Sequence, residues 1–397
     1  MSNDRSVFLM GLYYSSLHIA RSLGKRGISV FGIDIHKDPI GAHSRYIKRI
    51  DAPKGGEELR NFLFDFSRKQ GKSPVLIPLA DYYVVFLSDN SEALSEYFLF
   101  PTTNRETLSK LLSKTHSSEV LSQLGISHPK TLVFKKGDPS ESMHDTISFP
   151  CIMKPMYKHN WEKNPIVEEY VGEGQLVLHI ENESSLQESL QVLNPISDLI
   201  LQEFIPGSSE SYYYYVGYRD HKGRIVTSFL GNKVRTLPDC LGSETLLRSV
   251  HNEALRQYGD EILHRIKYEG PAGIDFKYDL RDSNYKVIEI NCRFGINDCY
   301  LIKYGIDLPY IYYLDSQKVE VTPIKNYPAN VTWYDPFRDL DWMRLYRKKA
   351  NMGWASWFCQ LLRYDTYAIF DWMDPWPFIQ SIFALMRRAL KKIVPFP

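Results

Sequence analysis

Two neighbouring segments carry oxygen ligands and an arginine at the spacing of a β-strand. The first holds Asp275, and the second holds Glu289, Asn291 and Arg293 at every second position. Both segments alternate apolar and polar residues, which predicts a β-hairpin closed by a loop over residues 279–285. Alternate side chains of a strand share a face, so the hairpin would gather the second set and could place Asp275 beside it.

The side chains on this shared face could bind a divalent cation that is coordinated to a nucleotide. Mg2+ uses one or two carboxylates and completes its shell with water and phosphate oxygens, so Asp275, Glu289 and Asn291 form a candidate site. Mn2+ takes the same oxygen ligands. Arg293 offers a planar, bidentate donor for a transferring phosphoryl group or an acyl phosphate. A solvated hairpin face with an incidental salt bridge would explain the same spacing.

Three further positions could contact a nucleotide. Lys154 ends an apolar strand, and Lys114 lies on the preceding helix, although either lysine alone is more often a surface residue. Residues 199–210 read as a strand that runs into an extended Pro-Gly segment. Its backbone groups could pair with an adenine edge, and the acid Glu210 could bind a ribose. An ordinary interdomain hinge is the alternative.

The turn after the first expected strand lacks the fingerprint of a nicotinamide site. It runs from Gly11 to Ser16, and Asp34 ends the second expected strand, where a dinucleotide-binding fold places its ribose acid. Only the first glycine of the fingerprint is present, and Tyr13 and Tyr14 would block the approach of a pyrophosphate. The pattern favours a βαβ scaffold whose turn faces a substrate.

The pattern of elements predicts an α/β region followed by an α+β region. A strand over residues 6–10, a helix that ends at Gly27 and a strand over 28–33 form a βαβ unit, and residues 75–79 add a buried parallel strand. Short strands and helices then alternate to about residue 320. Six of the seven tryptophans lie beyond residue 325, so the tail reads as a separate module.

Taken in chain order, these motifs resemble the ATP-grasp superfamily, in its carboxylate-amine ligase branch, over residues 5–320. The resemblance implies an N-terminal doubly wound, Rossmann-like pre-ATP-grasp domain, then a two-lobed ATP-grasp fold, and here a mainly helical C-terminal extension. The implied boundaries are 1–110 for the first domain, 111–205 for the small lobe, 206–324 for the large lobe with the metal site, and 325–397 for the extension.

The resemblance also implies a role for each motif residue. Lysines would neutralise the ATP phosphates, hinge backbone groups would hold adenine, and an acid would bind ribose; these residues are Lys114, Lys154, Glu203, Phe204, Ile205 and Glu210. Asp275, Glu289 and Asn291 would hold Mg2+. Lys233, Arg235 and Arg293 would face the γ-phosphate and the carboxylate substrate. The phosphate-covering loop would be Met156–Gly174, which departs from glycine-rich versions of this loop.

The implied reaction joins a carboxylate to an amine. A carboxylate oxygen attacks the γ-phosphate of MgATP to give an acyl phosphate and ADP, and an amine then displaces phosphate. Both substrates would be small molecules, and an envelope or polysaccharide precursor is one class of acceptor. Two other functions fit the same fold, namely a phosphotransferase and a nucleotide-binding, membrane-associated regulator that never turns over.

Charge and cysteine content exclude several classes of protein. The 397 residues include 48 Lys or Arg and 47 Asp or Glu, which argues against a globally basic nucleic-acid binder. The five cysteines form no CxxC pair, so neither a disulfide framework nor a zinc ribbon is expected, and a reducing cytoplasm is the expected location. No apolar run reaches the roughly 18 residues of a membrane-spanning helix.

The charge is divided unevenly along the chain. Residues 325–397 carry a net charge of +5, and residues 1–324 carry −4. Within the tail, residues 377–394 predict an amphipathic helix with Arg387, Arg388, Lys391 and Lys392 on its polar half. Such a helix could lie peripherally on the inner face of a membrane, pack on the body of the protein, or form a homodimer contact.

Overall fold

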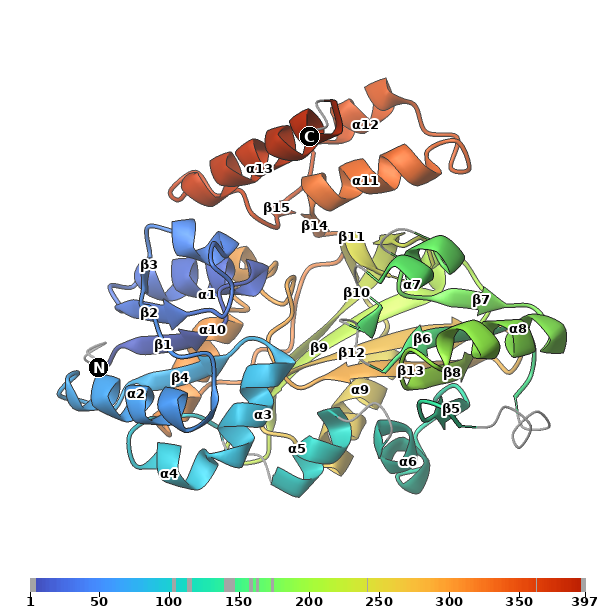
Figure 1. Ribbon diagram of the computed structural model, residues 1–397. Helices are drawn as coiled ribbons and strands as arrows, with labels where there is room; N and C mark the ends of the chain where they lie inside the picture. The colour runs from blue at the N-terminus through green and yellow to red at the C-terminus, as the bar shows by residue number, and fades with distance from the viewer. Residues whose placement is uncertain are drawn as a thin grey trace.

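The computed structural model describes residues 5–101, 105–112, 116–138, 147–156, 160–161, 164–172, 175–240, 242–361 and 363–393. Three sheets organise the chain, and a helical layer lies across one side of them (Figure 1). Mixed α/β and α+β character was predicted, and the structure confirms it.

The N-terminal unit is a parallel sheet with strand order β3-β2-β1-β4. Its strands are β1 (Val7–Met10), β2 (Val30–Ile33), β3 (Ile47–Arg49) and β4 (Val75–Pro78), and its helices are α1 (Tyr14–Gly24), α2 (Gly56–Arg68), α3 (Asp81–Asp89) and α4 (Ser91–Ser95). All four residues of β1 are buried, as expected for a parallel strand that is covered on both faces. The predicted βαβ unit is therefore confirmed.

The second unit is an antiparallel sheet with strand order β5-β8-β6-β7. It contains β5 (Thr131–Phe134), β6 (Cys151–Pro155), β7 (Leu178–Ile180) and β8 (Leu199–Glu203), with helices α7 (Pro165–Tyr170) and α8 (Glu183–Leu193). Helices α5 (Arg105–Leu112) and α6 (His116–Gln123) precede it. The strands of this sheet lie within residues 111–205, the range predicted for the small lobe.

The third unit is a sheet with strand order β13-β12-β9-β10-β11-β14-β15. Its strands are β9 (Tyr212–Arg219), β10 (Ile225–Leu237), β11 (Ser243–Val250), β12 (Gly270–Asp279), β13 (Asn284–Asn291), β14 (Thr332–Tyr334) and β15 (Thr366–Tyr367); helices α9 (Glu253–Ile266) and α10 (Leu308–Ser316) accompany them. The predicted hairpin is β12–β13, and Asp275 lies opposite Glu289 in it.

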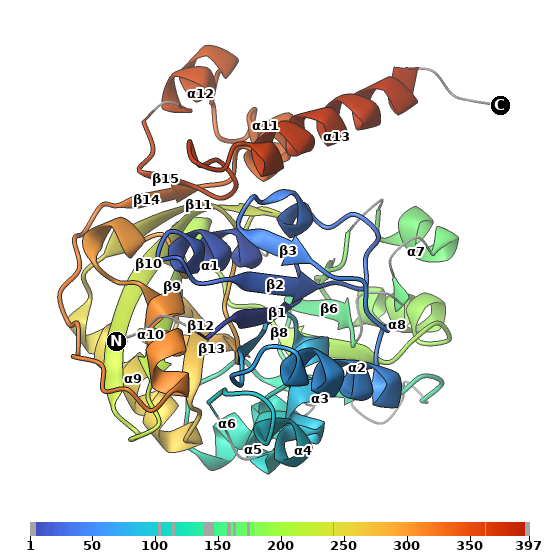
Figure 2. The same ribbon diagram turned by 90° about the vertical axis from the view of Figure 1, so that its left-hand side faces the viewer.

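The C-terminal extension is joined to the body by strands as well as helices. Strand β14 pairs with β11, and β15 pairs with β14, so the large sheet continues past residue 325, the predicted boundary. Helices α11 (Pro336–Tyr346), α12 (Trp354–Gln360) and α13 (Trp376–Ile393) form the layer outside the sheets, and α13 runs out beyond the body (Figure 2).

A buried arginine–aspartate pair also holds the extension to the N-terminal unit. Arg21 of α1 donates from Nε to Asp374, 2.9 Å away, and Ser44 donates to the same carboxylate at 2.7 Å. Arg21 is 4% exposed and Asp374 is fully buried.

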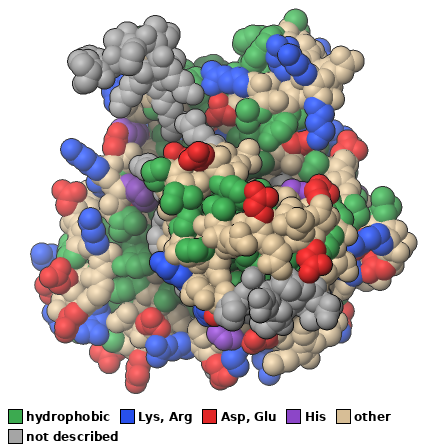
Figure 3. All heavy atoms as spheres, turned by 45° about the vertical axis from the view of Figure 1, so that its right-hand side comes forward, with side chains coloured by type: hydrophobic (Ala, Val, Ile, Leu, Met, Phe, Trp, Pro, Cys, Tyr) green, Lys and Arg blue, Asp and Glu red, His purple; other side chains and the backbone are tan. Residues whose placement is uncertain are grey.

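No helix in the described ranges is long and apolar enough to cross a membrane. On the face in Figure 3, acidic and basic side chains are interspersed.

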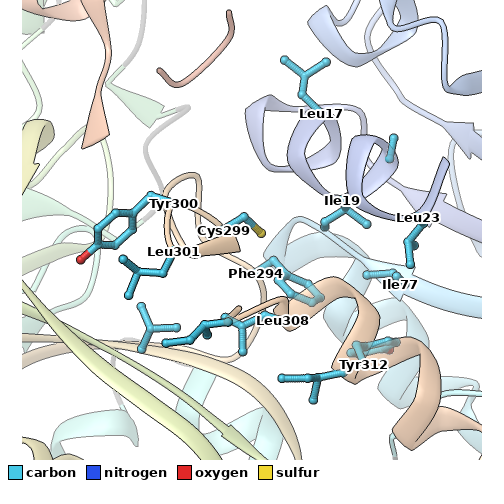
Figure 4. Packing of buried hydrophobic residues seen from close by; sticks show 14 of the residues in the cluster. Leu17, Ile19, Leu23, Ile77, Phe294, Cys299, Tyr300, Leu301, Leu308 and Tyr312 are labelled. Carbon is cyan, nitrogen blue, oxygen red and sulfur yellow. The ribbon is translucent and has the colours of Figure 1, made fainter. Parts of the chain in front are cut away.

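One hydrophobic core joins the N-terminal unit to the large sheet. Leu17, Ile19 and Leu23 of α1 belong to the same cluster of buried side chains as Phe294 and Tyr312 (Figure 4). The N-terminal unit is thereby fixed against α10 and the loop after β13.

His18 of α1 gives a pH-dependent test of this interface. Burial, followed by the charge of Arg21, lowers the pKa of His18 to about 3 from 6.5. Below about pH 6.5 His18 therefore binds a proton in the unfolded chain but stays neutral in the folded chain. The unfolding free energy thus falls as the pH falls toward 3. Between pH 7 and 5 the His18→Gln variant should lose about 2 kcal/mol less unfolding free energy than wild type, measured by urea denaturation. Equal losses would contradict a neutral, buried His18.

Candidate active site

A buried lysine between two carboxylates lies at the centre of the large sheet. The Nζ atom of Lys233, on β10, is 2.6 Å from Oδ1 of Asp275 on β12 and 3.1 Å from Oε2 of Glu244 on β11. Strand β9 runs between β10 and β12, and the ammonium lies 5.5 Å from the ring centre of Tyr214 on that strand. Glu244 also accepts a hydrogen bond of 2.7 Å from Asn297.

The electrostatics of the cluster keep its lysine charged. Burial raises the pKa of Asp275 to about 6, against the opposing effect of Lys233. Burial alone would lower the pKa of Lys233, but Asp275 and Glu244 together raise it above its usual value. Lys233 is 3% exposed and Glu244 is 5% exposed, so this positive charge is fixed in a poorly solvated site.

The structure brings the three predicted metal ligands together. Asp275 faces Glu289 across the β12–β13 pair, and Asn291 follows two residues later, opposite Gly273. Their oxygens are the hard donors that Mg2+ prefers, so the residues fit the ion. Within the described part of the chain, no group of three or more His, Cys, Asp and Glu side chains could hold a metal. A metal here would therefore depend on the Asn291 amide and on phosphate oxygens.

Arg293 links this edge of the large sheet to the N-terminal unit. Its Nε atom is 2.6 Å from Oδ1 of Asp81, the first residue of α3, and its Nη2 atom is 3.4 Å from Oδ1 of Asn291. About a quarter of the Arg293 side chain is exposed. The guanidinium therefore lies beside the predicted metal ligands and within reach of a ligand that enters from solvent.

The turn after β1 faces the same place. Gly11 has φ of 103°, and the amide of Leu12 donates to Oδ2 of Asp34 at 2.6 Å, so Asp34 holds the turn itself. Burial raises the pKa of Tyr13, and the charges of Asp34, Arg293 and Asp81 also act on it. Tyr13 therefore lies within the electrostatic range of the Arg293–Asp81 pair. The use of Asp34 within the turn is consistent with the missing dinucleotide fingerprint.

The hinge after β8 connects the small lobe to the large sheet. Glu203 ends β8 and forms an ion pair of 2.7 Å with Arg281, Phe204 contacts the ring of His179, and Ile205 is buried. Glu210 lies in the short helix Ser209–Ser211, and its carbonyl accepts from the Asn232 side chain at 2.6 Å.

Of the two lysines predicted to contact the ATP phosphates, the structure describes only Lys154. Lys154 lies on β6, and its Nζ atom is 3.1 Å from Oε1 of Gln202 on the neighbouring strand. Lys114 lies outside the described residues, as do several positions of the segment Met156–Gly174.

Arg235 is not brought to the cluster. Its guanidinium forms a two-pronged pair with Asp339 of α11, with Nε–Oδ1 at 2.8 Å and Nη2–Oδ2 at 2.9 Å. It also lies 5.3 Å from the ring centre of Trp342. The register of β10 against β11 shifts between Lys233 and Arg235. Arg235 thus holds the extension, although it was expected to face the γ-phosphate.

Sequence reasoning did not identify four residues of this region: Asp81, Glu244, Asn297 and Lys277. The first three come from segments without a recognisable motif and approach the cluster only through long-range packing. Lys277 had a local signal, because it follows Asp275 by two residues on a strand and so shares its face.

Comparison with known proteins supports the expected superfamily. No family model matches the chain. A D-aspartate ligase of Enterococcus faecium (strain Aus0004) is 26% identical over 253 residues, which is 60% of this chain and 58% of that ligase. The match thus spans less than two thirds of that ligase's length.

Solved structures share the fold. The N5-carboxyaminoimidazole synthetase of Staphylococcus aureus with ADP matches with a TM-score of 0.63 at 16% identity, over 81% of this chain and 79% of that one. An L-amino acid ligase from Bacillus licheniformis matches with a TM-score of 0.59 at 15% identity, over 82% and 76%. The fold that the ATP-grasp resemblance implied is therefore confirmed.

The role of Arg235 can be tested by a double-mutant cycle with Asp339. If Arg235 anchors the extension, Arg235→Met and Asp339→Asn should each lower the unfolding free energy by about 3–5 kcal/mol, because each leaves a buried group without its partner. The double variant should lose at least about 1 kcal/mol less than the two single losses combined. Chemical denaturation measures all three. Unchanged stability in Arg235→Met would contradict the anchoring role and favour a ligand-binding one.

Proposed function

We propose that this chain, which has the ATP-grasp fold, is a Mg-ATP-dependent ligase that joins a carboxylate to an amine and releases ADP and phosphate. The observation that carries the proposal is the convergence of a hard-oxygen ligand set with two fixed cations. Asp275, Glu289 and Asn291 share one face of the β12–β13 hairpin, and Lys233 and Arg293 border it.

In this proposal the chain positions charge and performs no covalent step itself. Asp275, Glu289 and Asn291 would hold Mg2+, which when bound neutralises phosphate oxygens. Lys233 and Arg293 would face the γ-phosphoryl group, where negative charge develops during transfer. Lys154 would contact the phosphates, residues 203–205 the adenine and Glu210 the ribose.

The proposed chemistry proceeds in two displacements. An oxygen of the substrate carboxylate attacks the γ-phosphorus, and the bond to the β,γ-bridging oxygen breaks to release ADP. The amine then attacks the carbonyl carbon of the acyl phosphate, phosphate leaves, and the nitrogen loses a proton. We expect the substrates to meet the nucleotide beside the Arg293–Asp81 pair, whose charges also act on Tyr13.

The relative indicates which substrate to try first. Because the matching enterococcal protein is named D-aspartate ligase, we propose an amino acid as the carboxylate and D-aspartate as the first candidate. The amine would come from a small molecule or from an envelope or polysaccharide precursor. That last idea draws on the exposed apolar surface of the extension.

The proposed ligase is tested by ADP release. Glu289→Ala and Arg293→Ala should each lower substrate-dependent ADP release by about 100-fold or more, since each removes a group that acts on the transferring phosphoryl. Removing Mg2+ with EDTA should abolish release. Glu188→Ala, an exposed acid on α8, is the matched control and should keep full activity.

Three outcomes would contradict this proposal. Full activity in the Glu289 and Arg293 variants would overturn the site. ADP release without free phosphate would indicate a phosphotransferase. ATP binding with no product under any mixture of carboxylate and amine would indicate a nucleotide-binding regulator.

We also propose that the extension rests peripherally on an anionic lipid surface, at the inner face of the cytoplasmic membrane. Trp376, Phe383, Met386 and Leu390 lie along one stripe of α13 and are all exposed, by 47–61%. In the preceding loop Trp372 is 87% exposed. The tail carries a net charge of +5, so its charge is complementary to anionic headgroups.

Vesicle flotation of the full chain tests the lipid surface. The protein should float with phosphatidylglycerol vesicles and much less with phosphatidylcholine vesicles. A Phe383→Ser, Met386→Ser variant should bind at least about tenfold more weakly, because two apolar side chains no longer insert. Leu280→Ser removes an exposed apolar residue outside the extension, in the loop between β12 and β13, and should bind normally. If the protein does not float with either kind of vesicle, the lipid proposal is wrong. If wild type is then a dimer and the double variant a monomer, the stripe is a homodimer contact instead.

A further inference from the structure

Lys277 is a buried cation that the proposed reaction does not use. It lies on β12, two residues after Asp275, and is 1% exposed. Its Nζ atom has no hydrogen-bond partner among the described residues. Burying a donor without an acceptor costs free energy, and a bound ligand that accepts a hydrogen bond from Nζ would offset this cost.

The surroundings of Lys277 are aromatic and belong to the hinge. The Nζ atom lies 4.3 Å from the ring centre of Tyr212 and 5.0 Å from that of Phe204. A side-chain Cβ at Gly207 would lie 3.9 Å from the Cε atom of Lys277. The lysine therefore runs beside the segment 203–210, which the proposed function assigns to the base and ribose.

The acids near the hinge are already paired with a different cation. Arg281 forms ion pairs with both Asp279, at 2.6 Å, and Glu203, at 2.7 Å. Lys233, by contrast, has two carboxylates of its own. Arg281 thus takes the two acids next to the hinge. Aromatic faces flank the Lys277 ammonium, and burial lowers its pKa against the opposing effects of Cys240 and Asp279.

Position along the strand indicates which part of a nucleotide Lys277 would contact. Two strand residues span about 7 Å, so Lys277 lies about 7 Å along β12 from Asp275, the proposed metal ligand, in the direction of the hinge. A nucleotide with its phosphates at Asp275 and its base at Phe204 would therefore bring its base to Lys277. An ammonium only donates, and a purine ring offers acceptor nitrogens at N1, N3 and N7.

We propose that Lys277 donates a hydrogen bond to a ring nitrogen of the purine and so positions the base against the hinge. This inference rests on the proposed function, because it takes the bound nucleotide to be ATP. Lys277 is then a positioning residue for the nucleotide, whereas Lys233 and Arg293 serve the phosphoryl group.

Direct binding measurements on the full chain test this inference with ATP, its 1-, 3- and 7-deaza analogues and tripolyphosphate. Wild type should bind one deaza analogue about tenfold more weakly than ATP. Lys277→Met should bind ATP about tenfold more weakly and should no longer distinguish that analogue from ATP. Lys277→Arg should restore part of the preference. Lys325→Met, at an exposed lysine, should behave as wild type.

Several results would overturn the inference. If wild type binds all three deaza analogues as tightly as ATP, the inference is wrong. This result needs no variant, so it decides the question even if the Lys277 variants fail to fold. The inference is also wrong if Lys277→Met binds ATP normally, keeps the wild-type preference, or loses affinity equally for every nucleotide and for tripolyphosphate.

ADP release separates this inference from the proposed function. Wild type that shows the lysine-dependent preference but never releases ADP would refute the ligase alone. Normal ADP release with unchanged binding in Lys277→Met would refute the role of Lys277 alone.

Discussion

The active-site region depends on one constraint, which is that Lys233 can be buried only while Asp275 and Glu244 both face it. The three residues come from three strands, and β9 passes between two of them. Tyr214 of β9 fits there because Gly273 has no side chain, since a Cβ at that position would lie 2.1 Å from the Tyr214 hydroxyl oxygen. The register of β12 against β13 sets Glu289 opposite Asp275, so the buried charges and the predicted metal ligands are fixed together.

Charge pairing also separates the structural cations from those available to a ligand. Arg21 and Arg235 are each bound to a buried aspartate of the extension, and Arg281 is bound to the acids at the hinge. Arg293 pairs with Asp81, an exposed aspartate at the edge of the N-terminal unit. The Lys277 ammonium lies against the rings of Tyr212 and Phe204 and has no hydrogen-bond partner among the described residues. Arg293 and Lys277 thus lie at the two ends of the proposed nucleotide site.

The parts of the site that sequence could predict are those set by local periodicity. Alternation along residues 270–291 was enough to predict the hairpin and the shared face of Asp275, Glu289 and Asn291. The resemblance placed both Lys233 and Arg235 at the γ-phosphate, but a register shift in β10 and a partner about a hundred residues later direct Arg235 to Asp339. Strands as short as β14 and β15 carry no readable pattern, so the tail was interpreted as a separate module although its first strand extends the large sheet.

The central claim is that a carboxylate is activated by transfer of the γ-phosphoryl group of ATP. An isotope experiment tests it most directly: the protein is incubated with ATP, an amine and D-aspartate labelled with 18O in its carboxylates, and the released phosphate is analysed by mass spectrometry. The account predicts one 18O atom in each phosphate, because the attacking carboxylate oxygen leaves with the phosphorus. ADP formed together with unlabelled phosphate would contradict an acyl phosphate intermediate on this substrate.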